Sequence, residues 1–176
     1  FLDEVVELAK DQKADLILMA GDVYDSVNPP AAAEQLFYDA AARLTEGGRP
    51  MVVIAGNHDQ PERVASITPL VSTRGITLIG TPIANAVTVS AARTGETAKI
   101  AALPYPSEAR LNELLSVDGD EDQLRRAYSE RVGKLMRMMA REFSPQTINL
   151  AMSHIYVLGG VESDSERPIQ VGGAYT

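Results

Sequence analysis

The sequence contains no cysteine, only two histidines and no long apolar run. Without cysteine there are no disulfides, no thiolate-bound zinc and no cysteine nucleophile, so any metal ion must be held by oxygen and imidazole ligands, which suit manganese, magnesium or a mixed site. No apolar stretch approaches the roughly 18 residues of a membrane-spanning helix, so we expect no association with a membrane. At 176 residues and 45% hydrophobic content, the chain can form one domain, residues 1–176, with a hydrophobic core.

An excess of basic residues is also missing, because 16 Lys and Arg stand against 24 Asp and Glu and give a formal net charge of −8. Non-specific affinity for nucleic acids comes mainly from Lys and Arg on phosphates, which excludes binding by a uniformly basic surface. A nuclease stays compatible with this charge if its DNA contacts are local, metal-mediated or supplied by a partner. The segment after Phe1 has no basic region typical of a secretion signal, and we expect a cytoplasmic protein.

Apolar residues recur along the chain with the spacings of short strands and amphipathic helices, which predicts an α/β fold. The expected helices lie at residues 1–12, 28–44, 62–71, 106–115 and 124–143, and the expected strands at 16–20, 51–55, 76–79, 147–152 and from 169. The two apolar segments that flank Arg93-Thr94-Gly95-Glu96 predict a β-hairpin over residues 87–103, which we expect to add an antiparallel element to the sheet.

Two short polar motifs each follow a strand that is predicted to be buried. The first motif is Gly-Asp-Val-Tyr-Asp at residues 21–25, and the second is Gly-Asn-His-Asp at residues 56–59. The other histidine, His154, also stands at the end of a predicted strand. Open α/β sheets bind their ligands outside the carboxyl ends of the strands, so this placement indicates a functional site.

The residue types in these motifs suit the hydrolysis of a phosphoester by metal ions. Two metal ions about 3.5 to 4 Å apart can generate a hydroxide nucleophile and neutralise the phosphoryl oxygens. Asp22 is placed to bridge such ions, Asn57 offers a neutral carbonyl oxygen, and His154 offers an imidazole nitrogen. The glycines that open the motifs let the backbone turn tightly, so that the following side chains point into the cleft.

His58 has a different expected role, because an imidazolium that faces the substrate stabilises phosphoryl charge or donates a proton to the leaving group. Asp25 and Asp59 are candidates to orient that ring or to support the metal ligands.

Each of these residues also has a purely structural interpretation. An isolated Asp22 or Asp25 is most often a turn or N-cap residue, an isolated Asn57-His58 pair a turn, and an isolated His154 a structural histidine. Their joint placement favours the metal site, because independent turns have no reason to gather both histidines at strand ends.

The pattern Gly-Asp-x-x-Asp followed by Gly-Asn-His-Asp resembles the calcineurin-like metallophosphoesterase superfamily. Protein phosphatases of that superfamily usually continue the first motif with Arg-Gly and end the second with Glu, whereas this chain has Ser26-Val27 and Asp59. The longer contexts at residues 20–30, 55–63, 153–160 and 162–167 closely resemble the bacterial SbcD-type nuclease family.

The resemblance implies a layered fold of mixed β-sheets flanked by helices and a site for two Mn²⁺ ions, with Mg²⁺ as the alternative. It implies that Asp22 is the bridging ligand, that Asn57 and His154 are ligands of one metal, and that His58 is the catalytic histidine. Asp25 lies where some relatives carry a histidine that assists the catalytic one, so we expect it to take part in catalysis.

The resemblance also implies a function in DNA repair, recombination and replication. The expected activities are a 3′ to 5′ exonuclease on double strands and an endonuclease on single strands and hairpins. The expected partners are DNA, a coiled-coil ATPase of the SbcC type and a second copy of the chain.

This chain departs from the family in two motifs. The family also uses an Asp-x-His motif on its first strand and a C-terminal Gly-x-His-x-His motif, and neither occurs here. We therefore expect an internal fragment of a longer nuclease, which by itself binds metal weakly and cleaves poorly. The alternatives are a phosphatase or nucleotide phosphodiesterase that uses the same site, and a scaffold fragment with an incomplete site.

Overall fold

The computed structural model describes residues 1–107 and 121–157, and only the backbone of residues 121–127. The helices are α1 (Leu2–Asp11), α2 (Ala31–Leu44), α3 (Pro61–Ser66), α4 (Thr68–Val71) and α6 (Glu121–Ala140), with 3₁₀ turns η1 (Glu46–Gly48) and η2 (Ser72–Arg74). The strands are β1 (Ile17–Ala20), β2 (Met51–Ile54), β3 (Ile76–Ile79), β4 (Val87–Ser90), β5 (Thr97–Leu103) and β6 (Ile148–Ser153). The expected strand from residue 169 and nearly all of the expected helix at 106–115 lie outside the described residues.

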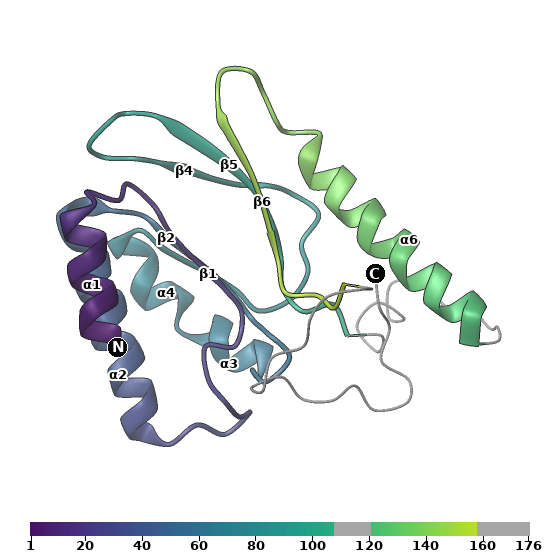
Figure 1. Cartoon of the computed structure of the whole chain (residues 1–176), viewed down its shortest axis with the longest axis horizontal. Helices are drawn as coiled ribbons and strands as arrows, with labels where there is room; N and C mark the ends of the chain where they lie inside the picture. The colour runs from purple at the N-terminus through teal and green to yellow at the C-terminus, as the bar shows by residue number, and fades with distance from the viewer. Residues whose placement is uncertain (108–120, 158–176) are drawn as a thin grey trace.

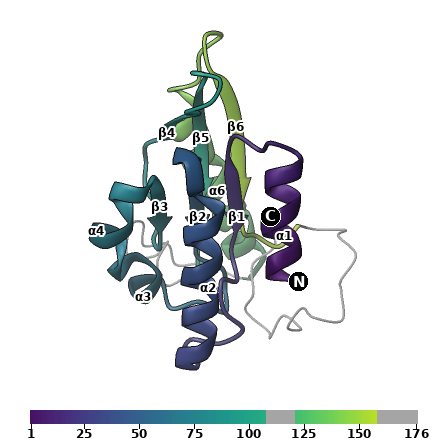
Figure 2. The same cartoon turned by 90° about the vertical axis from the view of Figure 1, so that its left-hand side faces the viewer.

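The first three strands form a parallel sheet in the order β1-β2-β3, as Figure 2 shows. Met51 of β2 is paired with Ile17 on one side and with Ile76 on the other. All four residues of β2 are buried, as expected for the central strand of a parallel sheet that is covered on both faces. The expected α/β class is therefore confirmed.

The chain is arranged in four layers, with helices on the outside and two sheets packed face to face between them (Figure 1). Successive residues of a strand point to opposite faces. On β2, Met51 and Val53 pack against α1, α2 and α3, whereas Val52 and Ile54 pack against the second sheet. The same alternation on β5 points Ile100 toward the first sheet.

The β4–β5 hairpin is present, but its expected position in the parallel sheet is wrong. β4 and β5 pair antiparallel, β5 pairs parallel with β6, and these three strands form a separate sheet. The physical reason is the burial of both faces of β5. Ile100 and Ala102 contact the first sheet, and Ala101 and Leu103 contact α6, so the hairpin packs on the first sheet instead of extending its edge.

The long helix α6 covers the outer face of the second sheet through the apolar stripe that its sequence predicts. Tyr128, Val132 and Met139 are buried against β5, with Phe143 packed at the margin of the cluster. By contrast, the expected helix over residues 62–71 is two short helices. Pro69 has no N–H to donate to the carbonyl of residue 65 and its ring crowds that carbonyl, so the first helix ends at Ser66.

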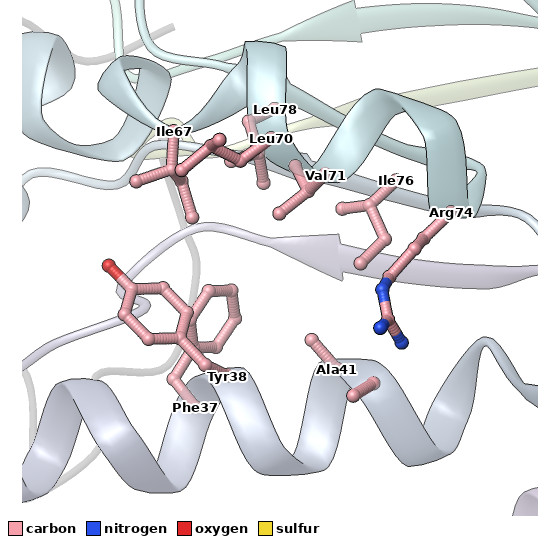
Figure 3. Close-up of a pocket in the computed structure, with 10 residues that line it drawn as sticks. Phe37, Tyr38, Ala41, Ile67, Leu70, Val71, Arg74, Ile76 and Leu78 are labelled. Atoms are coloured by element: carbon pink, nitrogen blue, oxygen red, sulfur yellow. The ribbon is translucent and has the colours of Figure 1, made fainter.

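A cavity of about 250 Å³ lies between α2 and the α3–α4 segment. Figure 3 shows Phe37 and Tyr38 on α2 facing Ile67 and Leu70 across it, with the guanidinium of Arg74 at one end. None of the residues that line this cavity belongs to the two motifs, and His154 does not line it. Within the described ranges, no helix is both long and apolar enough to cross a bilayer.

The contact between the two sheets predicts that two isoleucines of the second sheet contribute differently to the free energy of unfolding. Ile100 is 0% exposed between the sheets, and Ile148 on β6 is 45% exposed. Ile100→Ala should lower the free energy of unfolding by about 2–5 kcal/mol, because it leaves a cavity in a packed interior. Ile148→Ala, the matched control, should lower the free energy of unfolding by clearly less. Denaturant unfolding of both variants measures the difference, and equal losses would contradict the sandwich packing.

Candidate functional site

Three loops meet at the carboxyl ends of β1, β2 and β6, and they carry the two motifs and His154. Because β1 and β2 are parallel, the first and second motifs leave the sheet at the same edge. His154 follows the last residue of β6, and its backbone N–H donates to the carbonyl oxygen of Leu103 over 3.3 Å. Its ring nitrogen Nδ1 lies 2.9 Å from the carbonyl oxygen of Ala20 at the end of β1. The predicted gathering of the strand ends is therefore present.

The glycines of the two motifs are needed because the loops approach one another too closely for a Cβ atom. A Cβ on Gly21 would lie 2.2 Å from Nδ1 of His154, and one on Gly56 would lie 2.1 Å from Oδ1 of Asp22. Gly21 has a φ of 98° and Asp22 a φ of 47°, in the left-handed region that glycine enters freely and aspartate tolerates. This turn directs the Asp22 side chain toward the second motif.

Asp59, the last residue of the second motif, joins both motif loops through its buried carboxylate. It is 4% exposed. Its Oδ2 accepts hydrogen bonds from the backbone N–H groups of Val23 (3.0 Å) and Gly56 (2.8 Å), and its Oδ1 accepts one from Tyr24 (3.0 Å). Three donors to one ionised acceptor satisfy the charge without a cation. The sequence suggests Asp59 as a support for a histidine ring or a ligand, whereas these hydrogen bonds of its carboxylate anchor the backbone of both loops.

Oxygen and nitrogen atoms of Asp22, Asn57 and His154 converge at the centre of the site. Nε2 of His154 lies 2.8 Å from Oδ1 of Asn57 and 3.6 Å from Oδ1 of Asp22. The carbonyl oxygen of Ala20 can only accept, so it fixes the proton of a neutral His154 on Nδ1 and leaves a lone pair on Nε2. Nε2 of His154 and the side-chain oxygens of Asn57 and Asp22 are thus three atoms that can act as ligands of one cation.

This donor set fits a divalent cation. Ligand atoms at about 2.0–2.1 Å from an octahedral ion are about 3 Å apart when adjacent. The separation of 2.8 Å between His154 and Asn57 is close to this value, and that of 3.6 Å between His154 and Asp22 is longer. A histidine ligand usually donates its other ring N–H to a carboxylate or a backbone carbonyl, as His154 does to Ala20. Asp22, Asn57 and His154 are the residues that could hold such an ion. Within the described residues, no group of three or more His, Asp and Glu side chains could hold a metal ion. The present set contains only two such side chains, and its third donor is the amide oxygen of Asn57.

His58 lies beside this donor set but its ring is directed toward the first motif. The residue is 7% exposed, and its backbone N–H donates to Oδ1 of Asp22 over 3.1 Å. Nδ1 of its ring is 3.5 Å from Oδ1 of the exposed Asp25, which is a loose ion-pair distance. The structure therefore brings His58 and Asp25 together as one pair.

Two tyrosines also lie at the site, although the sequence assigns neither of them a role. The hydroxyl of Tyr156 accepts a hydrogen bond from Nδ2 of Asn57 over 3.2 Å. The ring of Tyr105 packs edge-on against both His154 and Tyr156. The signal for Tyr156 was its position two residues after His154, since alternate residues of an extended segment point to the same side.

Tyr24 of the first motif is less suited to proton transfer than His58 is. Burial raises the pKa of its phenol, and a hydrogen bond with Tyr38 raises it further. The phenol is therefore protonated and neutral across the physiological range.

Known proteins share this sequence pattern over nearly the whole chain. Residues 1–168 match the family model of the calcineurin-like phosphoesterases. The chain is also 49% identical over 176 residues to the SbcD subunit of the SbcCD nuclease of Bacillus subtilis (strain 168), an alignment that covers 99% of this chain and 45% of that protein. The chain thus spans less than half the length of the relative that it matches.

The anchoring role of Asp59 predicts a large effect from a small substitution. Asp59→Asn keeps the size of the side chain but turns an amide NH₂ group toward backbone donors. Hydrogen bonds to charged groups contribute about 1.5–3 kcal/mol each, so we expect the free energy of unfolding to fall by about 3 kcal/mol. Denaturant unfolding measures it, with Asp11→Asn at the exposed end of α1 as the matched control. An equal, small change in both variants would show that the carboxylate does not hold the loops.

Proposed function

The chain belongs to the calcineurin-like phosphoesterase family, and we propose that it forms the central part of a metal-dependent nuclease that cleaves phosphodiester bonds in DNA. The observation that carries the proposal is the convergence of potential ligand atoms from Asp22, Asn57 and His154. In this proposal Asp22 bridges two metal ions, and Asn57 and His154 hold one of them. Mn²⁺ is the proposed metal and Mg²⁺ the alternative.

Bound metal would supply a nucleophile from water and neutralise the charge of the phosphoryl oxygens. The pair formed by His58 and Asp25 would assist the departure of the leaving group. A protonated His58 ring donates a proton to the leaving oxygen or stabilises the phosphoryl charge. Asp25, whose Oδ1 lies 3.5 Å from Nδ1, would orient the His58 ring.

The substrates and partners follow from the relative, whose name identifies it as one component of a nuclease complex. We propose that the full-length protein trims double-stranded DNA from 3′ ends and cuts single strands and hairpins during repair and recombination. Its partners would be an SbcC-type coiled-coil ATPase and a second copy of the chain, in the cytoplasm. The net charge of −8 supports a division of labour in which a partner supplies part of the DNA affinity.

A substrate comparison tests the nuclease against a phosphatase or nucleotide phosphodiesterase that uses the same site. The full-length protein with Mn²⁺ should cleave a hairpin oligonucleotide and linear duplex DNA efficiently. It should cleave a chromogenic bis-phosphate ester poorly. The reverse preference would favour the small-substrate enzyme.

Replacing either histidine of the chain with glutamine should lower activity, but only one of the two replacements should lower the metal content. In the full-length protein, His58→Gln should lower the cleavage rate by at least about 100-fold, because general acid catalysis contributes about 10²–10⁴-fold. Its bound metal should stay close to that of the unmodified protein. His154→Gln, the matched control, should lower both activity and metal content. Activity on the hairpin and elemental analysis give the two readouts, and loss of metal from the His58→Gln variant would make His58 a ligand.

The 176-residue chain alone should bind Mn²⁺ weakly. Asp22, Asn57 and His154 supply three ligand side chains, which is too few for two ions that each prefer six oxygen or nitrogen ligands. Calorimetric titration should show weak binding that the His154→Ala variant reduces further. Two tight sites in the 176-residue chain would overturn this expectation.

A further inference from the structure

Tyr156 contacts the proposed metal site without supplying a ligand to it. It lies just beyond β6 and is half-buried. Nδ2 of Asn57 donates a hydrogen bond to its hydroxyl oxygen over 3.2 Å, although the two residues are 99 positions apart in the sequence. The same amide directs its oxygen toward Nε2 of His154, 2.8 Å away. Asn57 is therefore held at both ends of its side-chain amide.

The ring of Tyr156 is held in place by Tyr105. The centroids of these two rings are 6.2 Å apart with an interplanar angle of 90°, and Tyr105 packs on His154 at 6.3 Å and 82°. Such edge-to-face pairs stabilise the packing of the rings by more than the burial of their surface alone. The backbone N–H of Tyr105 donates to the carbonyl of Ala55 over 2.9 Å, which ties this aromatic group to the end of β2. The position of the Tyr156 hydroxyl is thus set by rings packed beside the site.

An asparagine needs such support more than a carboxylate does, because its two terminal atoms are chemically different. If the amide is rotated by half a turn, its NH₂ group faces His154 and donates to the Nε2 lone pair, which then cannot bind a cation. With the oxygen facing the cation, the NH₂ group turns away from the site and requires an acceptor. The Tyr156 hydroxyl is at the position where that acceptor is needed.

We propose that Tyr156 is a positioning residue that keeps the amide oxygen of Asn57 directed toward His154 and Asp22, and thereby strengthens metal binding. The inference rests on the proposed metal site and adds a residue to it. In this proposal Tyr156 is not a ligand and acts on the metal through Asn57.

The test is a Mn²⁺ titration of the full-length protein by calorimetry. Tyr156→Phe removes the hydroxyl and keeps the ring that packs on Tyr105. Loss of an outer partner of a metal ligand typically costs about 10- to 100-fold in metal affinity, and we expect at least a 10-fold loss here. The melting temperature of the metal-free protein should change little. Tyr38→Phe, the same atomic change on α2, should leave the metal affinity unchanged.

A double-mutant cycle with Asn57→Ala separates positioning from a general structural effect. In the Asn57→Ala background the affinity is already reduced, and Tyr156→Phe should change it by less than about 2-fold, because the residue through which it acts is gone. An equal loss in both backgrounds, or no loss in either, would overturn the inference. Absence of Mn²⁺ binding by the unmodified full-length protein would instead overturn the metal site itself, so the two failures are distinguishable.

Discussion

The site depends on one interaction, the acceptance of three backbone hydrogen bonds by the buried carboxylate of Asp59. Two of the donors, Val23 and Tyr24, belong to the first motif, and the third, Gly56, belongs to the second. A charged acceptor shared between two loops holds them in a fixed relation, because an unpaired buried carboxylate would be very costly. The close approach of Asp22 to the second motif follows from this connection.

The loops approach one another so closely that side chains of both motifs and of His154, which follows β6, gather in one place. Glycine at positions 21 and 56 removes the Cβ atoms that would separate the loops. Asp22, Asn57 and His154 then bring their potential ligand atoms together. The rigid frame comes from the packed strands behind them, since β2 is buried along its whole length.

Most helices and strands were predictable because their signals are local. The limits of β3, Ile76–Ile79, agree with the prediction, since glycines bound an apolar run of four residues. The stripe on α6 was also predictable from its helical spacing, and Tyr128, Val132 and Met139 are buried as expected. The hairpin was assigned to the wrong sheet, because periodicity shows that a segment is a strand and does not show which neighbour it pairs with.

By itself the sequence determined the chemistry of the site, namely which oxygen and nitrogen atoms are available and that they stand at strand ends. Only the tertiary structure decided which atoms meet. The stacking of two sheets brings His154 to within hydrogen-bond distance of Asn57, 97 residues away, and makes Tyr156 a partner of Asn57. The pairing of β1 with β2 places Asp59 where it can anchor both motif loops. The physical reason is that residue type and spacing encode local conformation, whereas the relative position of two loops results from the packing of side chains distant in sequence.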